Sequence, residues 1–159
     1  MFFALWPDDR VRGALHFHAQ ELHRGCGGRA MRRENLHLTL VFVGNVAAGR
    51  LDDLRSMADA ISATPSELVP GQTGFWRHNH IMWASPLTVP EPLRALVTGI
   101  EGALKQAGFD FDQRPYAPHI TLLRDGSRPK EFPALAPVRW PVASFSLVQS
   151  SGGRYKVLA

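Results

Sequence analysis

Two stretches of the sequence carry the same residues in the same surroundings. NLHLTL and APHITL each place a histidine two residues before a threonine inside an apolar run, and the two histidines, His37 and His119, are 82 residues apart. Side chains alternate between the two faces of a strand, so each histidine shares a face with its own threonine, Thr39 or Thr121. The leucines of the first stretch occupy the opposite face, which is typical of a core face. The polar pairs are therefore expected to point away from the core.

If the two halves of the chain pack about a pseudo-twofold axis, both His-x-Thr pairs line one cleft. Histidine titrates near neutral pH, so one neutral imidazole can take a proton from attacking water while the other, protonated, gives a proton to a leaving oxygen. Threonine hydroxyls can donate hydrogen bonds to the non-bridging oxygens of a phosphate. None of these roles requires a metal or another cofactor, so we expect none. A single copy of the motif would favour a plain core histidine bonded to its threonine, whereas two copies favour a shared site.

The elements that position these motifs are predicted from hydrophobic periodicity and turn residues. They run strand, helix, strand, helix, strands, helix, strand and strands, with a His-x-Thr strand after a helix in each half. This order indicates a diverged internal duplication. We predict one domain over residues 1–159 of the α+β class, bilobal with pseudo-twofold duplicated lobes, mostly antiparallel sheets lining a central cleft, and helices on the outside. The predicted spans are strand 2–6, helix 7–24, strand 35–44, helix 50–62, strands 66–76 and 80–86, helix 89–108, strand 117–124, and a final hairpin of 141–150 and 154–159.

Composition narrows the functional classes. The formal net charge is +4, spread along the chain, which mildly favours an anionic substrate and does not by itself indicate a nucleic-acid platform. The one cysteine, Cys26, excludes an internal disulfide and a multi-cysteine metal site, and it lacks the suitably placed histidine that a nucleophilic role requires. With no leader and no apolar run long enough to span a membrane, we expect a cytoplasmic protein, without a membrane partner, that acts as a monomer.

The remaining histidines and aromatic residues are weaker candidates. The triplets HFH at 16–18 and HNH at 78–80 could suggest a metal site, but neither has a complete set of metal ligands nearby. We therefore expect these histidines to be solvated. Stacking of Trp76, Phe3 or Tyr155 on a base is one possibility, and packing of these rings in the core is the other.

The motifs ENLHLTLVFVG and RPYAPHITLLR together closely resemble those of the 2H phosphoesterases. Within that superfamily the chain looks like the bacterial RNA 2',3'-cyclic phosphodiesterase family, also called the 2'-5' RNA ligase or LigT/ThpR family, since the opening FFALWPDD and the ending GGRYKVLA match that branch too. The likeness covers nearly the whole chain. One departure is RAMRRENLH, where the family often has a Trp-Val-Pro-Pro-like segment. Its Arg32 and Arg33 are candidates for contacts with RNA phosphates or for plain solvation.

The resemblance implies a specific reaction and roles. Substrates would be RNA ends or nucleoside 2',3'-cyclic phosphates, hydrolysed to a 2'-phosphomonoester. His37 would be the general acid toward the 3'-oxygen and His119 the base that activates water. Thr39 and Thr121 would hold the phosphate, and Arg124 would match a family arginine that contacts it.

Strand alternation alone gives a different answer for Arg124. It places this residue on the face of Ile120 and Leu122, away from His119, so that the guanidinium reaches the cleft only if the strand ends or bulges there.

Three alternatives keep the same site. The reverse reaction would ligate RNA ends through a 2'-5' bond. A related enzyme would act on another cyclic phosphate or on a 2'-5'-linked substrate. An RNA-end or nucleotide-binding protein would use the cleft without turnover, although binding a phosphate needs donors and not two titrating groups.

Overall fold

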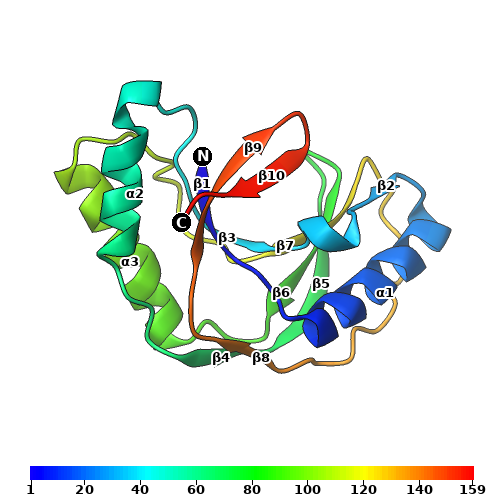
Figure 1. Ribbon diagram of the computed structural model, residues 1–159. Coiled ribbons are helices and arrows are strands. Elements are labelled where there is room, and N and C mark those ends of the chain that lie inside the picture. The colour runs from blue at the N-terminus through cyan, green and yellow to red at the C-terminus, as the bar shows by residue number, and fades with distance from the viewer.

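The computed structural model describes residues 1–159, and one eight-stranded sheet runs through it (Figure 1). Seven strands follow the order β10-β9-β1-β3-β7-β6-β5, β2 pairs with the edge of β7, and every pairing is antiparallel. A separate two-stranded sheet joins β4 to β8. The strands are β1 Phe2–Leu5, β2 Arg29–Ala30, β3 Leu38–Phe42, β4 Ser66–Leu68, β5 Pro70–Trp76, β6 Ile81–Pro86, β7 Ile120–Arg124, β8 Trp140–Val142, β9 Ser146–Ser151 and β10 Arg154–Val157.

The sheet divides into two lobes between β3 and β7. The first lobe holds β10, β9, β1 and β3, and the second holds β7, β6, β5 and β2. The strands β3 and β7 share one registered pair, Leu38 with Ile120, beyond which each strand pairs within its own lobe. The predicted α+β class, with two duplicated lobes of mostly antiparallel strands and helices outside, is confirmed.

Three helices cover the sheet, and each of the two long ones packs across the lobe boundary. Helix α1 (Asp9–Cys26) follows β1 of the first lobe but packs against β7 and β2 of the second. Helix α3 (Glu91–Gln106) follows β6 of the second lobe but packs against β3 of the first, beside α2 (Leu51–Asp59). In Figure 1, α1 accordingly lies on the opposite side of the molecule from α2 and α3. The chain thus crosses from one lobe to the other in both halves.

Local sequence explains where the helices begin and which face they bury. The side chain of Asp8 accepts a hydrogen bond from the backbone N–H of Val11 at 2.8 Å and caps α1, which ends at Gly27 with φ of 64°. The predicted apolar stripes of α1 and α3 are confirmed. Their buried residues are Val11, Leu15, His18, Ala19, Leu22 and Cys26 in α1, and Leu93, Leu96, Val97, Ile100 and Leu104 in α3.

The core lies between the helices and one face of the sheet. Its main cluster comprises 30 buried residues, among them Phe3, Leu38 and Ile120, which are fully enclosed. A second, smaller cluster occupies the opposite face of the first lobe, where Phe2, Ala4 and Val148 pack with Trp6 and Tyr155. The sheet therefore has an aromatic surface on the side away from the helices.

Several predicted spans differ from the structure. The second motif strand begins at Ile120 and not at residue 117, and the helix predicted over 50–62 ends at Asp59. The first motif strand begins at Leu38, because a short 3-10 helix occupies Arg33–Asn35. The predicted strand 66–76 is divided into β4 and β5, and the predicted strand 141–150 is divided into β8 and β9. In both cases the first piece leaves the main sheet to form the β4–β8 pair. None of the helices combines the length and the apolar character needed to cross a membrane.

The pair that joins the two lobes makes a stability test possible. Leu38 is fully buried, so Leu38→Ala removes packed atoms and leaves a cavity, and we expect it to lower the free energy of unfolding by about 2–5 kcal/mol. Leu87→Ala is the matched control, because Leu87 is 45% exposed and should change that free energy by about 0.5 kcal/mol. Urea unfolding followed by circular dichroism measures both, and equal effects would contradict the packing described here.

Candidate active site

The pairing of β3 with β7 brings the two His-x-Thr motifs together. With Leu38 across from Ile120, antiparallel register places His37 across from Thr121 and Thr39 across from His119. All four side chains alternate with the buried pair and so project from the sheet face away from the helices. We call this face the site face. The two histidines are diagonal neighbours across the strands, a relation that spans about 7–8 Å.

A β-bulge follows each threonine at the equivalent position. In the first lobe Ala4 pairs with Thr39 and Phe3 with Val41, so Leu40 is the extra residue. In the second lobe Trp83 pairs with Thr121 and Met82 with Leu123, so Leu122 is the extra residue. Both strands consequently show two successive buried residues after the threonine, and the next side chain returns to the site face.

The second bulge decides the orientation of Arg124. Simple alternation would place this residue away from His119, but Leu122 is bulged, which is the condition under which the guanidinium can reach the cleft. Arg124 is half-buried and takes part in none of the seven ion pairs of the chain. The neighbouring carboxylate of Asp125 is instead held by Arg29 at 2.7 Å. Arg124 therefore presents an uncompensated positive charge on the side of the sheet where the histidines lie.

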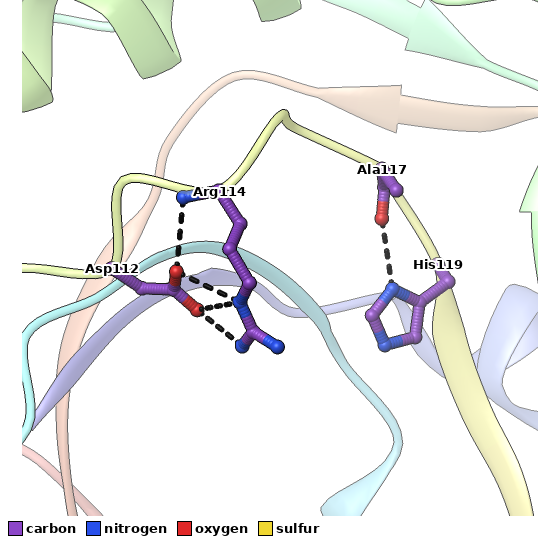
Figure 2. A network of polar contacts seen from close by, with 4 residues as sticks. All are labelled: Asp112, Arg114, Ala117 and His119. Carbon is purple, nitrogen blue, oxygen red and sulfur yellow. Dashed lines mark hydrogen bonds and ion pairs between the residues drawn. The ribbon is translucent and has the colours of Figure 1, made fainter. Parts of the chain in front are cut away.

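Both imidazoles are held through the same ring nitrogen. The Nδ1–H of His37 donates to the carbonyl oxygen of Asn35 at 2.7 Å, and that of His119 donates to the carbonyl oxygen of Ala117 at 2.8 Å (Figure 2). A carbonyl can only accept, so Nδ1 carries the proton in both rings. Nε2 of each ring is left as the nitrogen that can gain or lose a proton.

The segment that precedes each motif histidine is hydrogen-bonded to the strand that carries the other motif. Before His37, the backbone N–H of Met31 donates to the carbonyl of Leu122 in β7 at 2.8 Å. Before His119, the backbone N–H of Asp112 donates to the carbonyl of Phe42 in β3, also at 2.8 Å. The two histidines are thus positioned by reciprocal contacts between the lobes.

The segment that leads to His119 has two further ties. The Tyr116 hydroxyl donates to the carbonyl of Thr39 at 3.3 Å, and burial raises the pKa of this phenol well above its usual range. The Arg114 guanidinium donates several hydrogen bonds to the Asp112 carboxylate (Figure 2). These hydrogen bonds lower the pKa of Asp112.

Aromatic rings surround the two histidines unequally. The centroid of the His37 ring lies 5.0 Å from that of Phe2, 5.2 Å from that of Trp6 and 5.2 Å from that of Tyr155. The His119 ring has one close aromatic neighbour, Trp76, whose ring centroid lies 4.4 Å away in a T-shaped arrangement. His37 therefore lies in an aromatic enclosure, whereas His119 borders a more open region.

Burial and charge both lower the pKa of the two histidines. Burial is the larger cause for each, and it acts against the hydrogen bonds to the Asn35 and Ala117 carbonyls, which raise the pKa. The positive charge of Arg124 lowers both values further, and the charge of His119 also lowers the pKa of His37. Without a bound anion, the two imidazoles are therefore less readily protonated than an ordinary histidine. A bound anion would raise both pKa values by favouring the imidazolium forms.

The other sequence candidates lie elsewhere. His18 is buried and its Nε2 is 2.8 Å from the Thr73 hydroxyl, so the expectation that it is solvated is wrong. The HNH triplet at 78–80 is exposed, as expected. Phe3 is fully buried and cannot stack on a base, in contrast to the half-buried Trp76 and Tyr155.

Cys26 is buried at the end of α1, and Arg33 is engaged with Asp9 at the start of α1. No group of three or more His, Cys, Asp or Glu side chains is arranged to hold a metal ion.

Residues that the sequence did not single out include Trp6, Phe2 and Trp83. Phe2 and Trp6 lie on the site face and alternate with buried residues of β1. This alternation is present in the sequence FFALW, but its aromatic residues are easily mistaken for core residues. Trp83 lies beside Thr121 through the β6–β7 register. Only the strand pairing assigns these rings to the site.

The chain has clear relatives among known proteins. A family model described as the 2'-5' RNA ligase superfamily matches residues 7–154. The RNA 2',3'-cyclic phosphodiesterase of Escherichia coli K12 is 31% identical over 157 residues, covering 97% of this chain and 88% of the relative. The enzyme of the same name from Thermus thermophilus is 29% identical, covering 94% and 81%. The crystal structure of E. coli LigT in apo form superposes with a TM-score of 0.84 at 30% identity, covering 99% of this chain and 93% of that one.

The electrostatic arrangement generates a titration test. Replacing Arg124 by glutamine removes a positive charge that lowers both histidine pKa values, so we expect both to rise, measured by NMR from the pH dependence of the ring signals. Arg128→Gln is the matched control, since it removes an exposed guanidinium four residues further along the chain. Unchanged titration of His37 and His119 in Arg124→Gln would contradict the placement of Arg124.

Proposed function

The chain belongs to the 2'-5' RNA ligase superfamily, and on that premise we propose that it hydrolyses RNA or nucleoside 2',3'-cyclic phosphates to 2'-phosphomonoesters without a metal. The observation that supports this most directly is the convergence of both His-x-Thr pairs on one face at the β3–β7 pairing. Similarity to enzymes named RNA 2',3'-cyclic phosphodiesterase supports the same substrate class. The basic balance of the chain suits an anionic substrate.

Phosphate binding is the first role that the geometry suggests. The hydroxyls of Thr39 and Thr121 would donate hydrogen bonds to the non-bridging oxygens of the cyclic phosphate. The guanidinium of Arg124 would add charge-assisted hydrogen bonds, and it has no carboxylate partner to leave first. The negative charge of the substrate would in turn raise the pKa of both imidazoles and promote the protonated form that the acid requires.

His119 would act as the general base. Its Nδ1–H is committed to the Ala117 carbonyl, which leaves the Nε2 lone pair to take a proton from the attacking water. The water oxygen attacks phosphorus roughly in line with the bond to the 3'-oxygen. Positioning of the water against the held phosphate would supply much of the acceleration.

His37 would act as the general acid from the other side of the phosphate. Its Nε2–H would pass a proton to the departing 3'-oxygen as the P–O3' bond breaks, leaving a 2'-phosphomonoester and a 3'-hydroxyl. The rings of Phe2, Trp6 and Tyr155 lie against the imidazole and partly bury it. Since such an environment disfavours the imidazolium, the bound acid would release its proton readily.

A protein that bound RNA ends in the same cleft without turnover would need donors such as Thr39, Thr121 and Arg124. It would not need two imidazoles whose Nε2 atoms are both left open by matching hydrogen bonds. The paired and oriented histidines therefore favour an enzyme over a binding protein.

Removal of either histidine should abolish most of the turnover. We expect His37→Ala and His119→Ala each to lower kcat by at least about 10²-fold, the usual size of a positioned acid or base. The assay is a short RNA that ends in a 2',3'-cyclic phosphate, with 2'- and 3'-phosphate products separated by chromatography. His23→Ala, at an exposed position near the end of α1, is the control and should keep the wild-type rate. A 3'-phosphate product, or near-normal kcat in either variant, would contradict the assigned roles.

The lowered histidine pKa values determine the expected pH dependence. The free enzyme needs one neutral and one protonated imidazole, so kcat/KM should be bell-shaped, with its optimum on the acidic side of the ordinary histidine pKa of about 6.5. The kcat profile should lie at higher pH, because the bound phosphate raises both pKa values. Initial rates with adenosine 2',3'-cyclic phosphate from about pH 4 to 9 test this. A flat kcat/KM profile, or loss of activity in EDTA, would count against the mechanism.

A further inference from the structure

Two segments that are far apart in the sequence meet at the end of β7, and together they hold an excess of positive charge. Residues 24–34 and 124–131 contain seven of the 18 lysines and arginines of the chain but only three of its 14 aspartates and glutamates. Basic and acidic residues are equal in number over the rest of the chain, so these two segments account for the whole formal net charge of +4. Their basic residues are Arg24, Arg29, Arg32, Arg33, Arg124, Arg128 and Lys130.

Backbone contacts hold the two segments against each other. Arg29 of β2 is registered with Arg124 of β7, and the backbone N–H of Ser127 donates to the carbonyl of Cys26 at 3.0 Å. Gly28 permits this approach, because its φ is 74° and a Cβ there would lie 2.4 Å from the carbonyl oxygen of Arg124. We call the surface formed by residues 24–34 and 124–131 the basic edge.

Most of the positive charge on the basic edge is left without a carboxylate partner. Asp125 is bound by Arg29 at 2.7 Å, and Arg33 pairs with Asp9 at the start of α1. Four exposed residues of the edge take part in none of the ion pairs of the chain, namely Arg24, Arg32, Arg128 and Lys130. These four charges can therefore bind an anion without first breaking an ion pair.

The basic edge is continuous with the proposed phosphate site. Arg124 belongs to both, since it follows the bulge after Thr121 and is registered with Arg29. Cross-strand partners lie on the same face of a sheet, so Arg29 extends the positive charge from the site face toward the end of α1. An anion held by Thr121 and Arg124 thus has further positive charge on one side.

The other borders of the site carry less free positive charge. Along β10, Arg154 and Lys156 alternate with Tyr155, whose ring meets His37, so the two basic side chains start from the opposite face. The turn between β5 and β6 adds Arg77 as its one arginine or lysine. The basic edge is therefore the border that best suits a ligand with several negative charges.

We propose that the basic edge binds the RNA strand that precedes the terminal cyclic phosphate, and that this contact makes RNA ends better substrates than free nucleoside 2',3'-cyclic phosphates. The inference rests on the proposed function, because it takes the cyclic phosphate to lie between His37 and His119. A strand whose end is held beside Arg124 carries its preceding phosphates outward, and the basic edge begins there. Contacts between phosphates and basic side chains release counterions and are independent of base sequence.

Two double variants test this surface, Arg24→Gln with Arg32→Gln and Arg128→Gln with Lys130→Gln. Each removes two exposed positive charges outside the paired strands and outside the proposed phosphate ligands. The measured quantity is the ratio of kcat/KM for a short single-stranded RNA that ends in a 2',3'-cyclic phosphate to kcat/KM for adenosine 2',3'-cyclic phosphate. The wild-type ratio should favour the RNA, and kcat/KM for the cyclic nucleotide alone should be the same in both double variants as in the wild type.

Salt dependence gives the size of the expected effect. Each contact between a basic side chain and a phosphate of single-stranded nucleic acid contributes about 0.7 to the slope of log affinity against log salt. Raising the salt from about 50 to about 200 mM should therefore lower the wild-type ratio about sevenfold more than the ratio of either double variant, which lacks two contacts.

Arg94→Gln with Lys105→Gln is the matched control. Both residues are exposed on α3 and take part in none of the ion pairs, and their replacement gives the same net charge as either test variant. The control should keep the wild-type ratio and its salt dependence, and circular dichroism establishes that each variant is folded.

The outcomes separate this inference from the proposed function. A ratio that falls in the two edge variants and not in the control supports the basic edge. Edge variants that match the wild type, or that match an equally weakened control, overturn the basic edge and leave hydrolysis of the cyclic nucleotide intact. Absence of hydrolysis of both substrates by the wild type overturns the proposed function and this inference with it.

Discussion

The pairing of Leu38 with Ile120 is the contact on which the site depends. It is the one registered pair between β3 and β7, and it joins the two lobes at the point where both motifs begin. Because both residues are fully buried, the side chains on either side of them must face away from the core. A slip of one residue would send the histidines into the core and the leucines to the site face. Burial of two apolar side chains thus fixes the positions of four polar ones.

The lobes reinforce this pairing by exchanging elements. Helices α1 and α3 each follow a strand of one lobe and pack on the other, and the segments before His37 and His119 each bond to the other motif's strand. Separation of the lobes would therefore break helix packing and backbone bonds in both halves at once. A site built from two distant parts of the chain gains its rigidity in this way, which a positioned acid and base require.

The sequence predicts the parts of this architecture whose signals are local. The strands, the apolar faces of α1 and α3, and the shared face of each His-x-Thr pair all follow from periodicity within a few residues. The bulges at Leu40 and Leu122 do not, because a bulge exists only relative to a partner strand, and the partners lie far away in the chain. The orientation of Arg124 depends on such a bulge, so strand alternation alone could not decide its face. The β4–β8 pair is unpredictable for the same reason, since its strands are more than seventy residues apart.

The two lobes are related by symmetry, but the proposed reaction needs two histidines in opposite protonation states. The backbone offers no distinction, because both rings donate Nδ1–H to the carbonyl two residues earlier and both strands bulge after the threonine. The side chains that the lobes do not share give the two rings different surroundings. After the bulge, β7 presents Arg124 to the site face, where β3 presents the exposed ring of Phe42. Three aromatic rings enclose His37, whereas His119 borders a pocket of about 260 Å³. An enclosed imidazole suits proton donation to a departing oxygen, and an open one suits the side from which a nucleophile must arrive.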